Sequence, residues 1–508
     1  WWMANTGPST RTASVGSVTT TAISMMRSVN GDRPVISRSI QIRFWSLLGN
    51  VGVGCAVAEV ASVMRHCHRA GRRGQGLPGA ETMPAMPAFP LTIAFSAALL
   101  LSLVVKYWLA TRQTRHVAAH RAAVPPAFAA TVSLAAHQRA ADYTLAKGRL
   151  GLLSTAFSAA VLLGWTLLGG LDALNGWLLA TVQPAWGNLA YQLALLAAFT
   201  VIGALLDLPF ELYATFRLEQ RFGFNRTTPR LFIADLLKNT LVGALIGLPL
   251  AALVLWIMGA TGGLWWLWAW GTWVGFNLLI MVVYPTLIAP LFNQFTPLAD
   301  EGLKARVQAL MQRCGFAAKG LFVMDGSRRS AHGNAYFTGL GAAKRVVFYD
   351  TLLAKLNAGE VEAVLAHELG HFKHRHITQR MVMVFGLSLA ALALLGWLAR
   401  QPGFYTGLGV LPNIGAPNDA LALLLFMLVV PVFGFFAAPL SAQLSRAHEF
   451  QADAYACAQA SGADLASALL KLHQDNAATL TPDPVYVRFY YSHPPASERL
   501  AALALRGA

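Results

Sequence analysis

Two histidines and a glutamate in His367-Glu368-Leu-Gly-His371 have the residue types and the spacing of a metal site. The surrounding stretch, residues 361–376, has apolar residues at helical spacing and no proline, which predicts a helix. Four residues make about one helical turn, so both imidazoles project from one face toward a common point. Two neutral imidazoles can bind zinc, and Glu368 lies beside them as a base for an attacking water. The alternative is two structural histidines beside an unrelated acid, so a third ligand is needed.

The composition indicates an integral membrane protein. Of 508 residues, 56% are hydrophobic and only 12% are charged, against about 25% in ordinary soluble domains. The formal net charge of +16 fits basic loops that orient membrane helices, so membrane lipids are expected as surroundings and nucleic acid is not expected as a partner. The four cysteines are scattered without a C-x-x-C pair, which leaves histidine and carboxylate as metal ligands.

Seven apolar runs of about 20 residues predict seven membrane spans. They cover residues 91–109, 150–171, 189–208, 240–258, 264–287, 381–398 and 420–439. The linkers at 106–149 and 216–238 are rich in lysine and arginine, whereas the alternate linkers at 172–187, 259–263 and 401–419 contain neither. The positive-inside rule then puts the amino end of the first span outside and the carboxyl-terminal tail in the cytoplasm.

These spans divide the chain into five parts. Residues 1–88 predict a disordered or non-native N-terminal extension, whose apolar run at 44–64 is alternatively a targeting segment or an extra span. Residues 89–287 carry spans one to five, 288–380 a protease segment with the predicted metal helix, 381–439 spans six and seven, and 440–508 a second protease segment. Two spans separate the polar segments, so both lie on the cytoplasmic side and can share one site.

Two further histidines near the motif are poor ligands. His374 shares the face of His367 and His371, but it lies seven residues, about 10 Å, from His367 along a straight helix. His376 faces the opposite side. We therefore expect both His374 and His376 to be solvated residues at a helix end.

A better third ligand lies in Ser-Arg-Ala-His-Glu449-Phe-Gln-Ala-Asp453. Glu449 and Asp453 stand four apart on one face of another predicted helix. One carboxylate can complete a His₂Glu zinc site, and the other can accept the free N–H of a ligand histidine and fix its tautomer. The alternative is a solvated acidic face, but no acid occurs between Asp419 and Glu449. One zinc ion per chain is therefore predicted.

The first polar segment predicts mixed α/β structure. A helix is expected at 302–314 and strands at 321–324 and 345–349. Between the strands, Asn334, Ala335, Tyr336 and Phe337 predict an edge strand that ends at a glycine turn. An edge strand beside a protease site can bind an extended peptide by main-chain pairing, and an ordinary hairpin is the alternative.

Several motifs together resemble the integral-membrane CAAX prenyl protease 1 family of zinc metallopeptidases, over about residues 90 to 505. The shorter heat-shock membrane metalloproteases share the zinc motifs but have fewer spans. The matching stretches include Asp325-Gly-Ser-Arg-Arg-Ser-Ala-His-Gly-Asn-Ala-Tyr-Phe, His367-Glu-Leu-Gly-His, Ser445-Arg-Ala-His-Glu-Phe-Gln-Ala-Asp and Tyr491-Ser-His-Pro-Pro-Ala-Ser-Glu-Arg-Leu.

The resemblance implies a mainly α fold, a seven-transmembrane-helix bundle enclosing a chamber, with a gluzincin-like α/β zinc protease domain. It implies that His367, His371 and Glu449 bind zinc and that Glu368 is the base. It also implies that Asp453 is the carboxylate that supports a ligand histidine. It also makes His493 and Arg499 candidates for stabilising the tetrahedral intermediate, and residues 334–337 the substrate-binding edge.

The implied substrate is a peptide or protein whose prenylated cysteine lies near the C-terminus, from which the last three residues are removed. The alternative is a quality-control protease for membrane proteins, with the same chemistry and no lipid requirement. The Ala/Gly/Arg-rich composition favours a bacterial inner membrane over the endoplasmic reticulum, with the active site accessible from the cytoplasmic side.

Overall fold

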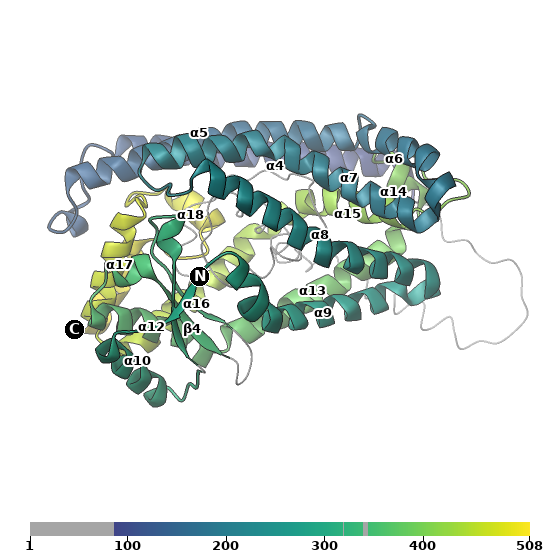
Figure 1. Cartoon of the computed structure of the whole chain (residues 1–508). Helices are drawn as coiled ribbons and strands as arrows, with labels where there is room; N and C mark the ends of the chain where they lie inside the picture. Colours follow the sequence, from purple (N-terminus) through teal and green to yellow (C-terminus); the bar gives the residue numbers. More distant parts are fainter. Residues whose placement is uncertain (1–85, 319, 339–343, 508) are drawn as a thin grey trace, which may run out of the picture.

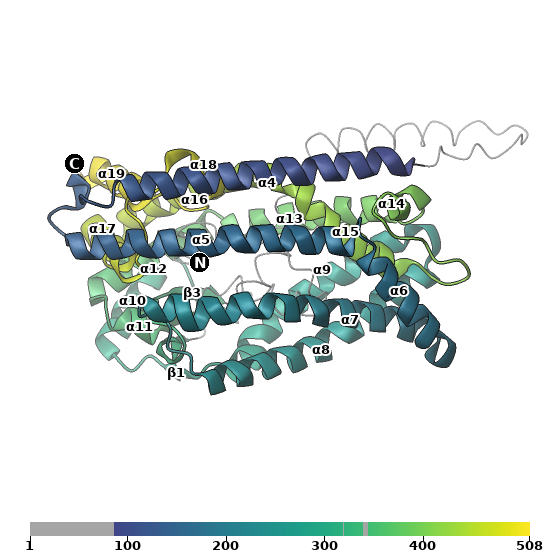
Figure 2. The ribbon, with the colours of Figure 1, turned by 90° about the horizontal axis from the view of Figure 1, so that it is seen from above.

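The fold is known from a computed structural model that describes residues 86–318, 320–338 and 344–507 (Figure 1). The predicted N-terminal extension, with its apolar run at 44–64, lies outside the described residues except for 86–88. The described chain is mainly helical, with one small sheet. The membrane helices form a long bundle, and the sheet and the helices around it lie at one end (Figures 1 and 2).

Seven helices within the described residues are long and apolar enough to cross a membrane, which confirms the predicted number. The first five are α4 (Ala88–Ala119), α5 (Leu134–Trp165), α7 (Gln183–Tyr213, extended by a π-helical turn at Ala214–Glu219), α8 (Pro229–Ala260) and α9 (Trp265–Val283). The last two are α13 (His376–Leu398) and α15 (Asp419–Gly434), the latter continuing into α16 (Ala438–Gln459).

The predicted end of the second span was wrong. The apolar run continues to residue 171, but α5 ends at Trp165 and a separate helix, α6 (Gly170–Thr181), follows. Glycines allow this sharp break: Gly169 has a φ of 78°, and a Cβ on Gly170 would lie 2.5 Å from the carbonyl oxygen of Gly164. Hydropathy alone does not register such a turn.

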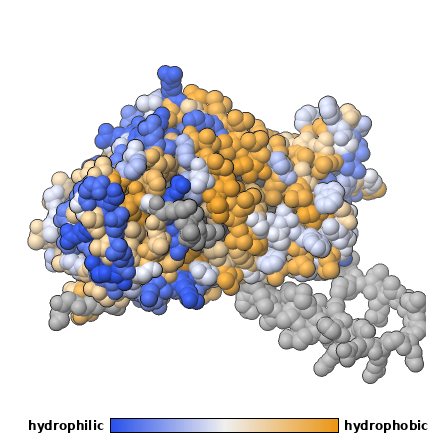
Figure 3. Space-filling view, turned by 60° about the horizontal axis from the view of Figure 1, so that its bottom comes forward, coloured by the Kyte–Doolittle hydropathy of each residue, from blue (hydrophilic) through white to orange (hydrophobic). Residues whose placement is uncertain are grey.

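The seventh span is the most enclosed part of the bundle. In its most apolar window 61% of the residues are buried, against 17% to 33% in the other six spans. The outer spans expose large apolar side chains, as Leu241, Leu245 and Trp256 do on α8. A broad hydrophobic region accordingly covers the middle of the surface, and hydrophilic side chains gather at the protease end (Figure 3). This pattern fits lipid around the bundle, and the enclosed span leads directly into α16.

Both basic linkers contact the protease segments. The amide of Gln474 donates to the carbonyl of Thr131 between α4 and α5, and the backbone N–H of Arg226, before α8, donates to the carbonyl of Arg329. The connections at α6 and α14 (Pro402–Thr406) lie at the opposite end of the bundle (Figure 2). The predicted parity is confirmed: the two polar segments lie on one side. That this side is cytoplasmic stays a prediction.

The first protease segment forms a four-stranded sheet in the order β1-β2-β4-β3. Strands β2 and β4 are parallel, and the two outer pairs are antiparallel. Because β3 pairs only with β4, it is an edge strand, as predicted, starting one residue later than expected. The strands are β1 (Phe295–Pro297), β2 (Leu321–Met324), β3 (Ala335–Thr338) and β4 (Arg345–Tyr349).

Helices pack on this sheet and join it to the second protease segment. Val307, Val347 and Leu365 belong to one buried apolar core with residues of α17. The helices are α10 (Glu301–Arg313), α11 (Asp350–Leu353), α12 (Ala358–Lys373), α17 (Gly462–Asp475), α18 (Pro484–Tyr490) and α19 (Ala496–Gly507).

Helix α12 carries the H-E-x-x-H sequence and begins with a capping box. The Asn357 side chain accepts from the backbone N–H of Glu360, and the Glu360 carboxylate accepts from that of Asn357. Glu360 also accepts from Lys471 and Ser467 on α17. Residues 360–370 of α12 are buried, so the helix is held from its first turn onward.

Gly370 allows α12 and α16 to lie in close contact. A Cβ at this position would lie 2.9 Å from the Cα of Ala452 and 3.0 Å from its carbonyl oxygen. Real Cβ atoms do not approach backbone atoms so closely, and neither helix backbone can yield without moving the whole helix. The glycine between the two histidines therefore sets the distance to the helix that carries Glu449 and Asp453.

We predict that Gly370→Ala separates α12 from α16 and lowers the free energy of unfolding by about 1–3 kcal/mol, the usual range for overpacking. Zinc affinity falls as well, because the ligands on the two helices move apart. Thermal unfolding and chelator competition measure the two effects. Gly386→Ala on α13 is the matched control, since its Cβ would meet nothing within 4 Å. Parental zinc affinity in Gly370→Ala would contradict this account.

Candidate metal centre

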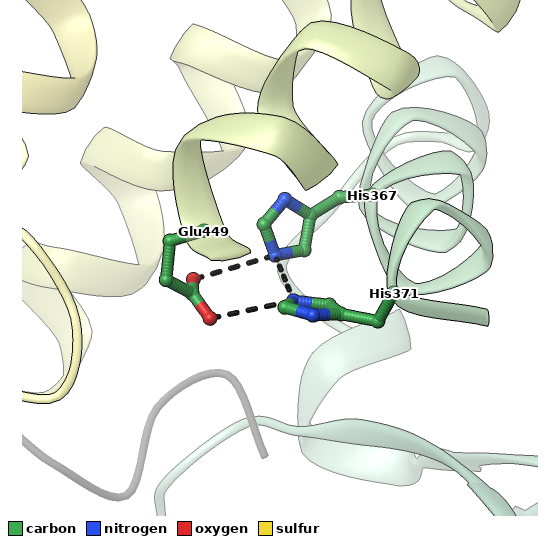
Figure 4. Close-up of side chains that lie close together, drawn as sticks. All are labelled: His367, His371 and Glu449. Atoms are coloured by element: carbon green, nitrogen blue, oxygen red, sulfur yellow. Dashed lines mark hydrogen bonds and ion pairs between the residues drawn. The ribbon is translucent and has the colours of Figure 1, made fainter. Parts of the chain in front are cut away.

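His367, His371 and Glu449 converge between α12 and α16 (Figure 4). The Nε2 atoms of the two histidines lie 3.3 Å apart. Glu449 Oε1 lies 3.3 Å from His371 Nε2, and Oε2 lies 3.5 Å from His367 Nε2. His367 and Glu449 are buried and His371 is partly buried. The structure thus brings together the three predicted ligands from segments that two membrane spans separate.

The spacing of these donor atoms fits a zinc ion. Tetrahedral zinc with bonds of about 2.0–2.1 Å sets its ligand atoms about 3.3 Å apart. Glu449 Oε2 is buried and has no hydrogen-bond partner within the described residues, which is costly for a carboxylate unless a cation is nearby. Nitrogen and oxygen donors in a His₂Glu set are also those that catalytic zinc sites use.

A buried ion-pair network holds the rear of the site. Asp453 Oδ1 lies 2.8 Å from His367 Nδ1, which leaves the Nε2 of His367 facing Glu449. The Arg499 guanidinium donates to both oxygens of Asp453, with Nε 2.8 Å from Oδ2, and its Nη1 lies 3.7 Å from Glu449 Oε2. Asp453 therefore lies where it can fix the tautomer of His367, and Arg499 holds Asp453.

The charges around His367 favour its protonated form when no cation is present. Burial lowers the pKa of His367, but the carboxylates of Asp453 and Glu449 favour the charged imidazolium, outweigh this and raise the pKa to about 9. A proton therefore occupies this buried position in the metal-free protein. A metal ion must displace that proton to bind the imidazole.

Glu368 and His493 flank the three converging groups. Glu368 is next to His367 on α12, and its Oε1 is buried with no hydrogen-bond partner within the described residues. His493 Nε2 lies 3.3 Å from Glu449 Oε1. Burial lowers the pKa of His493 to about 4, although the Glu449 charge acts in the opposite direction. His493 is thus neutral near pH 7 and can donate a hydrogen bond without carrying a charge.

The predicted substrate edge contains one unused donor. Asn334 is 1% exposed, its Oδ1 accepts from the N–H of Ala335, and its Nδ2 has no hydrogen-bond partner in the part of the chain that the structure describes. The carbonyl of Asn334 accepts from Tyr349 on β4. Ala335 and Tyr336 are buried, and Phe337 is partly exposed. All three lie on β3, the edge strand at the opposite side of the sheet from β1.

The prediction for His376 was wrong, whereas His374 is exposed as expected. His376 is only 5% exposed, and its Nδ1 lies 3.1 Å from Nδ1 of the predicted ligand His371. The reason is a break between two helices: α12 ends at Lys373, Arg375 adopts a left-handed φ of 56°, and α13 begins at His376. A straight helix was assumed through this stretch. The sequence feature that could have indicated this contact is His376 itself, which lies five residues after His371.

The fold and the converging donor set define a metallopeptidase whose catalytic domain is built onto a seven-span membrane bundle. Two family models match this chain: "CAAX prenyl protease N-terminal, five membrane helices" over residues 113–294 and "Peptidase family M48" over residues 297–506. Together they cover the membrane spans from the end of α4 to α9 and then both protease segments with the two spans between them.

Relatives and a solved structure agree with these matches. The CAAX prenyl protease 1 of Saccharomyces cerevisiae is 33% identical over 401 residues, which is 75% of this chain and 88% of the relative. The homolog from Arabidopsis thaliana is 37% identical over 318 residues, 62% of this chain and 74% of the relative. The crystal structure of S. mikatae Ste24p has a TM-score of 0.76 at 30% identity and covers 82% of this chain and 100% of that one.

The chain belongs to the CAAX prenyl protease 1 family of M48 metallopeptidases. It is an integral membrane metalloendopeptidase of the Ste24 type, which acts on a peptide or protein and uses a metal ion. The resemblance found in the sequence motifs is confirmed, as is the fold class.

Proposed function

We propose that this protein is a zinc endopeptidase that cleaves near the C-terminus of prenylated CAAX-type substrates. The observation that carries the proposal is the triangle of His367, His371 and Glu449, with the unpartnered Glu368 carboxylate oxygen beside it. One zinc ion, held by these three side chains, would supply Lewis-acid activation of a water and of the scissile carbonyl. The remaining chemistry belongs to the residues around it.

Glu368 acts as the general base and then as the general acid. It takes a proton from the water as the water oxygen attacks the scissile carbonyl carbon, and it delivers that proton to the amine as the carbon–nitrogen bond breaks. The products are a carboxylate and a free amine. Oε1 is buried without a hydrogen-bond partner in the described chain, which supports this role because no donor occupies the oxygen that must accept the proton.

His493 and Arg499 contribute differently. His493 is partly buried, neutral and next to Glu449, so it is placed to donate a hydrogen bond to the oxyanion. Arg499 is a second candidate for the oxyanion, but Nε and Nη2 are already bound to Asp453. We propose that Arg499 acts chiefly by holding Asp453, and that Asp453 in turn orients His367.

The residues from Asn334 to Phe337 bind the substrate backbone. The outer edge of β3 carries main-chain groups that can pair with an extended peptide. The Asn334 amide Nδ2, buried and without a partner in the described chain, adds a donor that a substrate carbonyl can satisfy. The prenyl group is inferred from relatives that bear the name CAAX prenyl protease.

We predict that Glu368→Gln lowers kcat about 10²–10⁴-fold, the range that general acid–base catalysis contributes. The amide keeps the size of the side chain but cannot accept the proton. Zinc content is unchanged, because Glu368 is not a ligand. Peptide cleavage assays and metal analysis of the same preparations measure both quantities. Glu301→Gln, an identical change on the exposed surface of α10, is the control. Parental turnover in zinc-loaded Glu368→Gln would end this mechanism.

The lipid requirement is tested with one peptide in two forms. We expect a farnesylated CAAX peptide to be cleaved faster than the same peptide without the farnesyl group, at matched concentrations in one membrane preparation. A chelator abolishes both reactions if the metal is essential. Equal rates for the two peptides would instead support a quality-control protease that recognises no lipid.

A further inference from the structure

His376 lies directly behind a proposed zinc ligand. It is the first residue of α13, the sixth membrane span, and is 5% exposed. Its Nδ1 lies 3.1 Å from His371 Nδ1, and its Nε2 lies 2.8 Å from Oε1 of Gln451 on α16. Neither His376 nor Gln451 has a part in the mechanism above.

The direction of each hydrogen bond in this chain is determined. His371 presents Nε2 to Glu449 and to His367, so in the metal-bound form its proton is on Nδ1. That N–H must donate to His376 Nδ1, which therefore accepts. The neutral His376 then carries its proton on Nε2 and donates to the amide oxygen of Gln451. Each group can fill its role in only one tautomer.

We infer that His376 is a positioning residue that fixes the tautomer and the ring orientation of the zinc ligand His371. The inference rests on the zinc site proposed above. His376 is the partner of His371 Nδ1, the ring nitrogen that does not face the proposed zinc ion, as Asp453 is the partner of His367 Nδ1. Hydrogen-bonded partners of this kind hold a ligand ring in the orientation that its metal requires.

The fold holds the His376 ring from several sides. Its ring stacks on His448 of α16 with centroids 3.9 Å apart and an interplanar angle of 10°, and more distantly on His374 at 5.5 Å. Arg375, at a φ of 56°, forms the corner that turns His376 back toward α12. The first residue of a membrane span is thereby tied to both helices that carry zinc ligands.

A neutral partner for His371 suits the charges of this site. Glu368, Glu449 and Asp453 already place three carboxylates near one guanidinium, that of Arg499. A further carboxylate behind His371 would add a fourth buried negative charge to this site. A neutral imidazole that accepts from His371 and donates a hydrogen bond to Gln451 orients the ligand without adding charge.

The test compares zinc affinities of full-length variants by chelator competition. We expect His376→Ala to weaken zinc binding about 10- to 100-fold, the usual effect of losing such a partner. His376→Asn should restore affinity to within about threefold of the parent, because the amide oxygen takes the place of the accepting Nδ1. His120→Ala, the same change at an exposed histidine beyond the end of α4, is the matched control and should bind zinc as the parent does.

A merely structural role would give a different result. In that case His376→Leu, which fills the same space without an acceptor, would bind zinc as tightly as His376→Asn, and this would overturn the inference. The Leu and Asn pair also decides the question if His376→Ala does not fold. Parental zinc affinity in His376→Ala or His376→Leu would contradict the role of His376 and would leave the proposed zinc site unaffected. Failure of the parent to bind zinc would sink the proposed zinc site as well.

Discussion

The contact between α12 and α16 is the constraint on which the site depends. One helix supplies His367 and His371, the other supplies Glu449, and within the described residues these three donors come from two separate segments. Two membrane spans, α13 and α15, lie between them in sequence. The bundle therefore has to return the chain to its starting side before a metal site can exist, and Gly370 then decides how closely the helices approach.

Charge explains why a divalent cation suits this place. Three buried carboxylates, those of Glu368, Glu449 and Asp453, lie with the guanidinium of Arg499 around the two ligand histidines. Two negative charges then remain uncompensated, and burying them without a counter-ion is costly. In the metal-free protein a proton on His367 offsets part of this charge. The two positive charges of a zinc ion would balance both of these negative charges.

Much of this architecture could be predicted from the sequence because the signals are local and strong. Long apolar runs give the spans, helical spacing places His367 and His371 on one face, and counting spans puts Glu449 on the same side. The family motifs add His493 and Arg499, which the structure places beside Glu449.

The incorrect predictions arose where the direction of the chain depends on the backbone angles of one residue. A left-handed Arg375 moves His376 from the predicted solvent-exposed face to a buried position behind His371. Gly169 and Gly170 similarly break the apolar run that seemed to extend α5. Helical periodicity assumes a continuous axis, so it fails at such corners. The contacts of Gly370 with Ala452 were also beyond prediction, because they need the distance between two helices.

The central claim is that one zinc ion is held jointly by α12 and α16, and zinc-edge X-ray absorption tests it most directly. For the parent the account predicts one zinc per chain, bound by two imidazole nitrogens and carboxylate oxygen at about 2.0–2.1 Å. Glu449→Ala should then lose the carboxylate contribution together with most of its zinc. A parent-like zinc spectrum at full occupancy in Glu449→Ala would contradict the account.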